Sequence, residues 1–100
     1  MPKTLENFKK AFPDAWSSYE QLKQACDKAG PLDAKTAELI KAGISVALEH
    51  EGGLVAHVSQ AKKAGAKPEE IYHAILLATG LAGFPAVLAG FSAAKKYLEG

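Results

Sequence analysis

The spacing of helix-breaking residues, in a sequence rich in helix formers, constrains the fold of this chain more than any other feature. Alanine, lysine, glutamate and leucine are abundant, and no stretch alternates valine or isoleucine with polar residues as a half-buried strand does. Helix breakers interrupt the sequence at short intervals: Pro13, Gly30-Pro31, Gly52-Gly53, Gly65 and Gly80 to Gly83. These patterns predict an all-α fold, with one compact domain of about six helices over residues 1–100.

The bounds of the expected helices follow from caps and from apolar spacing. Thr4 can cap the first helix, Pro13 suits the first turn of the second, and Asp33 is a good N-cap for the third. The predicted helices run from Thr4 to Phe12, Pro13 to about Ala29, Asp33 to about His50, Leu54 to Ala64, Pro68 to between Gly80 and Gly83, and Pro85 to about Leu98.

The segment from Ala74 to Ala94 has 21 residues without a charge, which is long enough to cross a bilayer of about 30 Å. Its Gly83-Phe84-Pro85 centre, however, is typical of a break between two shorter helices. It also has many alanines and few large aliphatic residues. We therefore expect two buried helices, no membrane span, and assembly of the chain into a homo-oligomer that hides the apolar surface.

Charge and cysteine content exclude several classes of function. The formal net charge is +1 and all twelve cations are lysines, whereas nucleic-acid recognition relies on arginine, so we expect no nucleic-acid partner. Cys26 is alone, which excludes an internal disulfide and paired-thiol motifs, and it is interpreted as a packing residue. Because the segment Met1–Glu6 has no apolar signal core, we expect a cytoplasmic protein.

One neighbourhood gathers several reactive side chains beside a break in the backbone: Glu38, Ser45, Glu49, His50, Glu51, Gly52, Gly53 and His57. If a hinge at Gly52-Gly53 folds the fourth helix back along the third, Glu38 can face His57, and a carboxylate that orients a histidine prepares it for proton transfer. Two interpretations stay open. In the second, Glu38 is a solvated surface residue that pairs with Lys35 and Lys41, and His57 is an ordinary half-buried histidine.

The remaining candidates have weaker support. No close histidine–carboxylate pair anchors a metal site made of Glu38, His50 and His57, so we expect no cofactor, and metal-assisted catalysis through His50 and His57 stays open as a further alternative. His73 is interpreted as a surface or interface residue without a role. One group of apolar residues is interpreted as core or as the lining of a small apolar pocket: Ile71, Ile75, Leu76, Leu81, Phe84 and Leu88.

Five segments in order resemble the carboxymuconolactone decarboxylase family, which includes the alkylhydroperoxidase D-like proteins: Leu32–Ile40, Ser45–Leu48, Ala56-His57, Ala64–Ile71 and Gly83–Ala86. The resemblance covers about residues 32–90. It implies an all-helical fold and assembly into trimers or hexamers with active sites near subunit contacts. In the alkylhydroperoxidase D-like branch it places a catalytic glutamate on Glu38 and a histidine on His57. The two cysteines of that branch fall on His50 and Gly53, so a dithiol peroxidase cycle is not expected.

The decarboxylase branch acts on a carboxylated lactone and needs no cysteine pair. By this resemblance we expect acid/base chemistry on a small organic acid, with His57 as the acid/base, Glu38 as its orienting partner and His50 as an auxiliary polar group. Substrate contacts are expected from Gly53, Lys41 and Phe84. The alternative is a non-catalytic oligomer of the same family that binds a small apolar or carboxylated ligand.

Overall fold

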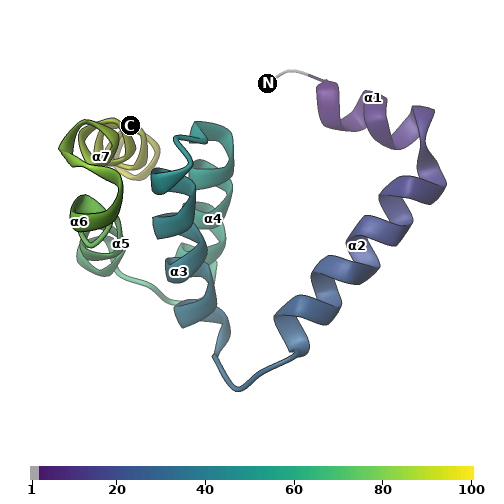
Figure 1. The fold of residues 1–100 in the computed structure, drawn as a ribbon, viewed down its shortest axis with the longest axis horizontal. Helices are drawn as coiled ribbons and strands as arrows, with labels where there is room; N and C mark the ends of the chain where they lie inside the picture. Colours follow the sequence, from purple (N-terminus) through teal and green to yellow (C-terminus); the bar gives the residue numbers. More distant parts are fainter. Residues whose placement is uncertain (1–2) are drawn as a thin grey trace. The chain divides into compact units, whose positions relative to one another are not determined.

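A computed structural model describes residues 3–100, and every regular element in that range is an α-helix (Figure 1). The all-α prediction is confirmed. The helices are α1 (Thr4–Ala11), α2 (Pro13–Lys28), α3 (Ala34–Ala47), α4 (Glu51–Lys63), α5 (Pro68–Leu76), α6 (Thr79–Ala82) and α7 (Phe84–Glu99). Met1 and Pro2, which belong to the segment interpreted as lacking an export signal, lie outside the described residues.

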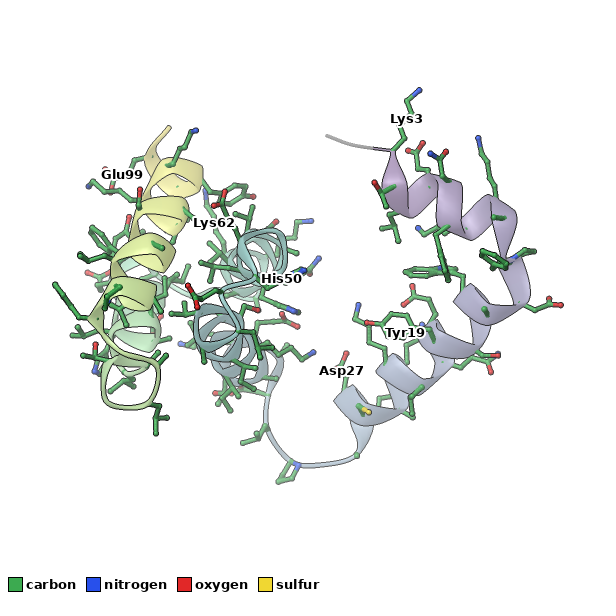
Figure 2. All side chains as sticks on the ribbon, turned by 45° about the horizontal axis from the view of Figure 1, so that its top comes forward. Lys3, Tyr19, Asp27, His50, Lys62 and Glu99 are labelled. Carbon is green, nitrogen blue, oxygen red and sulfur yellow. The ribbon has the colours of Figure 1, made fainter. Side chains whose placement is uncertain are left out.

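The described part of the chain groups into two compact units, which divide after Pro31. The first unit contains α1 and α2, and neither helix has a buried residue. Phe8 and Phe12 place their ring centroids 5.3 Å apart, and the rings of Trp16 and Tyr19 are 5.5 Å apart. Tyr19 projects from the middle of α2 (Figure 2). The two helices therefore carry large aromatic groups that this unit does not bury.

The second unit, residues 32–100, contains the hydrophobic core. Four helices form it: α3 packs on α4 and α5, and α7 packs on all three of them (Figure 1). Most residues of the core are small or β-branched, and its largest fully buried side chains are Leu54, Ile71, Ile75 and Val58. Small residues permit a close approach of helices: at Gly90 of α7, an added Cβ would lie 2.7 Å from Cγ2 of Val46 on α3.

The turn between α3 and α4 differs from the expectation. α3 ends at Ala47 rather than near His50, and α4 begins at Glu51 rather than at Leu54. Glu49 takes a positive φ of 54°, so the chain reverses at Leu48–His50. The expected hinge at Gly52-Gly53 is wrong, because both glycines belong to the first turn of α4.

The uncharged segment is divided between helices as predicted, but its apolar residues are less buried than expected. The single helix predicted after Pro68 is broken between α5 and α6, where the Thr79 hydroxyl donates to the carbonyl of Leu76 at 2.6 Å. Ile71 and Ile75 are core residues as predicted. Of the two interpretations given to these apolar residues, the core position is wrong for four that are at least half exposed, Leu76, Leu81, Phe84 and Leu88, whereas Leu81 does line an apolar cleft.

The last two expectations concern Cys26 and a membrane-spanning helix. Cys26 is exposed on α2, so its interpretation as a packing residue is wrong for the single chain. Within residues 3–100, every helix is too short or too polar to span a bilayer.

Candidate functional site

Glu38 and His57 form the central contact of the candidate site. Glu38 lies on α3 and His57 on α4, and the turn at Leu48–His50 folds α4 back along α3. Nδ1 of His57 lies 2.8 Å from Oε1 of Glu38. The two side chains are 26% and 17% exposed, so the contact is largely sheltered from solvent. Of the two interpretations that the sequence left open, the contact between Glu38 and His57 is the one found.

Lys41 is the second partner of Glu38. It follows one helical turn later on α3, and its Nζ lies 3.4 Å from Oε2 of Glu38, with the lysine side chain 26% exposed. The two carboxylate oxygens thus face different partners, imidazole on one side and ammonium on the other. With Glu38 ionised, its Oε1 accepts a hydrogen bond from Nδ1–H of His57, which leaves Nε2 as the nitrogen that can exchange a proton with a ligand.

His50 has a structural contact that the sequence analysis missed. It is the N-cap of α4, and its Nδ1 accepts a hydrogen bond from the backbone N–H of Gly53 at 2.8 Å. This contact satisfies one of the free N–H groups at the start of the helix, as serine or aspartate does at other N-caps. Gly53 permits it, because a Cβ at that position would overlap Nδ1 of His50. The pattern of a polar residue three positions before a glycine is too weak a signal to predict this cap.

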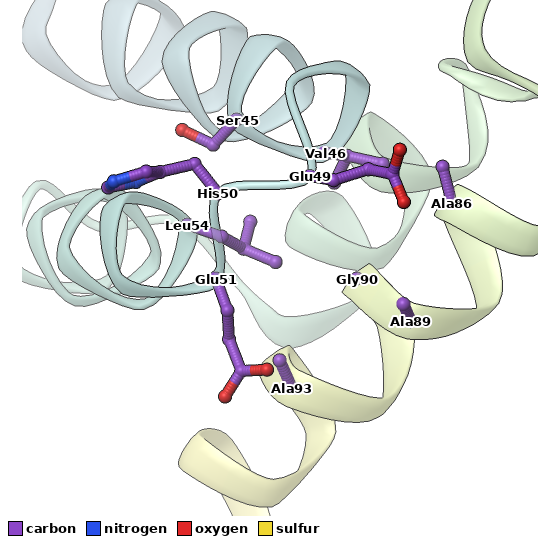
Figure 3. Close-up of a pocket in the computed structure, with 10 residues that line it drawn as sticks. All are labelled: Ser45, Val46, Glu49, His50, Glu51, Leu54, Ala86, Ala89, Gly90 and Ala93. Carbon is purple, nitrogen blue, oxygen red and sulfur yellow. The ribbon is translucent and has the colours of Figure 1, made fainter.

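A small cavity of about 130 Å³ lies between the α3–α4 turn and α7 (Figure 3). Leu54 points from α4 toward α7, the carboxylates of Glu49 and Glu51 lie on either side of it, and the imidazole of His50 points away from α7 (Figure 3). The cavity is lined by Ser45, Val46, Glu49, His50, Glu51, Leu54, Ala86, Ala89, Gly90 and Ala93. Neither Glu38 nor His57 lines this cavity.

The model of the carboxymuconolactone decarboxylase family matches residues 13–96, which is most of the chain. The chain belongs to the carboxymuconolactone decarboxylase family. The matched range includes α2 and both members of the Glu38–His57 pair. Comparisons with curated proteins and with solved structures gave no match.

A second and larger cleft in this family member, of about 470 Å³, lies along α3, α5 and α6. Its lining is mostly apolar and includes His73, the histidine that was given no role in the sequence analysis. Glu70, at its edge, has a pKa below its usual range, because the backbone N–H of Lys67 and then the Lys35 ammonium, 3.0 Å away, stabilise the charged carboxylate. The spacing of Ile40 and Ile44 one turn apart, on either side of Gly43, is the sequence signal that points to this cleft.

The other predicted site residues are dispersed. Phe84 begins α7 and is 58% exposed, and it lines neither of these two clefts. Gly53 contacts His50 rather than an open space for substrate. Among residues 3–100, no three side chains of histidine, cysteine, aspartate or glutamate come together as a possible metal site. The structure thus brings together Glu38, His57 and Lys41.

Proposed function

We propose that this member of the carboxymuconolactone decarboxylase family performs acid/base chemistry of the decarboxylase type on a small organic acid. The observation that carries the proposal is the 2.8 Å contact between His57 Nδ1 and Glu38 Oε1, whose side chains are only partly exposed. A histidine whose tautomer is held by a carboxylate is the usual arrangement for proton transfer near neutral pH.

The proposed reaction replaces a carboxylate on carbon by hydrogen. The bond between the carboxylate and its neighbouring carbon breaks, CO₂ leaves, and the electron pair stays on that carbon as an enolate-type anion. Nε2–H of the His57 imidazolium then donates its proton to the carbon, and His57 regains a proton from solvent. Glu38 stabilises the imidazolium, and Lys41, on the far side of Glu38, supplies positive charge for an anionic substrate.

A dithiol peroxidase reaction is not proposed. That reaction needs one thiolate as nucleophile and a second thiol to resolve the oxidised product. The chain has a single cysteine, Cys26, which lies on α2 outside the α3–α4 pair of helices.

The alternative function is non-catalytic binding of a small ligand by an oligomer of the chain. The observation that favours it is the 130 Å³ cavity of Figure 3, which is apolar along α7 and is lined by neither Glu38 nor His57. A ligand held there would not need the proton-transfer pair.

The test is decarboxylation of carboxymuconolactone and related carboxylated lactones by the purified full chain, followed by NMR of the product. His57→Gln should lower the rate by about 10² to 10⁴-fold, the usual contribution of a general acid. The matched control is His73→Gln, which changes a histidine on α5 outside the pair and should leave the rate unchanged. Activity that survives His57→Gln contradicts the proposed mechanism. Ligand-induced NMR shifts at Leu54 and Ala89 without turnover would support the alternative function instead.

A further inference from the structure

The cap of α4 holds His50 in one tautomer. The backbone N–H of Gly53 donates to Nδ1 of His50 at 2.8 Å, and a ring nitrogen that accepts a hydrogen bond carries no proton. The proton of the neutral imidazole is therefore on Nε2, which can only donate. The residue is exposed, and its ring points away from α7 (Figure 3). The start of α4 thus presents an N–H donor of fixed orientation.

Ser45 supplies a second donor beside His50. The backbone N–H of His50 donates to the carbonyl of Ser45 at 3.0 Å, so the two residues are neighbours across the α3–α4 turn. Ser45 is only 8% exposed, and among residues 3–100 its hydroxyl has no hydrogen-bond partner. In the same range, no side-chain oxygen that is sealed from solvent is left without a partner. The Ser45 hydroxyl therefore opens onto a space that a ligand can occupy.

The two donors face the same side of the α3–α4 turn. Figure 3 shows the hydroxyl of Ser45 and the imidazole of His50 both directed away from α7, and both residues line the cavity at this turn. The carboxylates of Glu49 and Glu51 lie on the other side, toward α7 (Figure 3). A ligand held by Ser45 and His50 is therefore kept apart from these two negative charges.

The charges around the two donors favour an anion. The start of α4, a helix of 13 residues, is the positive end of the helix dipole. Glu38 precedes Ser45 by seven residues and so shares its face of α3, but the Glu38 carboxylate is paired with the ammonium of Lys41 at 3.4 Å. Two donors side by side at this position match the two acceptor oxygens of a carboxylate.

We propose that Ser45 and His50 bind a carboxylate group of a small organic acid, with the Ser45 hydroxyl donating to one oxygen and Nε2–H of His50 to the other. Gly53 acts on this site through His50, because its N–H sets the tautomer and its missing side chain leaves room for the imidazole. Gly53 is thus a positioning residue. The inference does not depend on the proposed reaction, because a carboxylate can be bound here with or without turnover.

The first test is an NMR titration of the full isotope-labelled chain with propionate, compared with propionamide as a neutral analogue of similar shape. Propionate should give saturable shifts at the amides of Ser45 and Gly53. Propionamide should bind roughly tenfold more weakly, since hydrogen bonds to a charged group are the stronger ones. Equal binding of the two probes contradicts the proposal, and so do shifts confined to α7.

The second test measures the affinity for propionate in two matched pairs of variants. Ser45→Ala should raise the dissociation constant roughly tenfold by loss of a hydrogen bond to a charged group, whereas Ser92→Ala, an exposed position on α7, should bind as the native chain does. Gly53→Ala displaces the imidazole and should also bind weakly, whereas Gly52→Ala leaves the imidazole in place. Circular dichroism checks that each variant is folded. Native affinity in folded Ser45→Ala or folded Gly53→Ala overturns the proposal.

The third test needs no substitution. NMR of the imidazole nitrogens in the native chain, at about pH 8 where an ordinary histidine is neutral, reports which nitrogen carries the proton. We expect the proton on Nε2 of His50 and on Nδ1 of His57, since the first nitrogen pair is set by Gly53 and the second by Glu38. A proton on Nδ1 of His50 removes the donor and overturns the proposal, whatever the result for His57.

Discussion

Substitution of the two adjacent glycines of α4 tests the cap formed by His50. A Cβ added at Gly52 would lie 3.9 Å from Cε1 of His50, an ordinary contact, whereas a Cβ at Gly53 would overlap Nδ1. Both glycines belong to the first turn of one helix, so Gly52→Ala is a matched control for Gly53→Ala. Only the second substitution should displace the imidazole from the backbone N–H of Gly53.

Two effects of opposite sign act on the free energy of unfolding of Gly53→Ala. Replacing glycine by alanine within a helix stabilises the folded chain by about 0.5–1 kcal/mol, and this gain applies to both variants. Loss of an N-cap contact costs about 1 kcal/mol, within a range of about 0.5–2 kcal/mol. Because the gain cancels, the free energy of unfolding of Gly53→Ala should be lower than that of Gly52→Ala by the loss of the cap alone, about 0.5–2 kcal/mol. For a chain of this size the difference corresponds to roughly 2–16 °C in the unfolding temperature.

The assay is thermal and urea unfolding of the full chain at fixed protein concentration, followed by circular dichroism. A double-mutant cycle with His50→Ala completes the design. In the absence of the imidazole, Gly53→Ala should stabilise the chain as much as Gly52→Ala does. The reasoning is refuted if the two variants unfold alike in the native background, or if their difference persists after His50 is removed.

Two further predictions concern packing and acid stability. Gly90→Ala places a Cβ 2.7 Å from Val46 and should destabilise the chain by about 1–3 kcal/mol. In Gly43→Ala the added Cβ meets only a backbone carbonyl at 3.5 Å, so this substitution should be neutral or stabilising. Urea unfolding of the two variants checks the difference. Asp33 and Glu70 have lowered pKa values because backbone N–H groups donate to their carboxylates. The stability that these two carboxylates contribute is therefore present above their unfolded-state pKa values. It is lost as the pH falls through their folded-state pKa values. The urea midpoint should therefore fall as the pH is lowered from about 5 to about 3, and less steeply in Asp33→Asn, which keeps the cap without a titrating group.

Much of the helical pattern could be predicted from single residues. Asp33 caps α3 as predicted, with its side chain accepting from the N–H of Thr36 at 2.7 Å, and Pro68 begins α5 as predicted. The break between α5 and α6 was not predicted, because it falls at Leu77 and Ala78, two good helix formers that precede the expected breaker at Gly80. The predicted core was too large, since exposure of Leu81 depends on how many helices surround it rather than on its neighbours in sequence.

The candidate site, too, could be predicted only in part. The contact of Glu38 with His57 follows from two helices that run back along each other, and sequence spacing was enough to suggest it. The role of Gly53 was predicted wrongly, because paired glycines are typical of a hinge, and only the position of the His50 imidazole makes the second one necessary for a helix cap. Sequence spacing gives proximity along helices, but it does not give the direction of a side chain at a turn.

The same cap bears on which residues remain for chemistry. The family resemblance places the two cysteines of the dithiol branch on His50 and Gly53, and in this chain those two positions make one structural hydrogen bond. Nδ1 of His50 accepts from Gly53 only while it is unprotonated, so a proton taken up there breaks the cap of α4. Only Nε2 of His50 is left for another contact, whereas Nδ1 of His57 lies 2.8 Å from a carboxylate oxygen of Glu38. The acid/base chemistry that we propose therefore uses the Glu38–His57 pair, whereas His50 and Gly53 together form a helix cap.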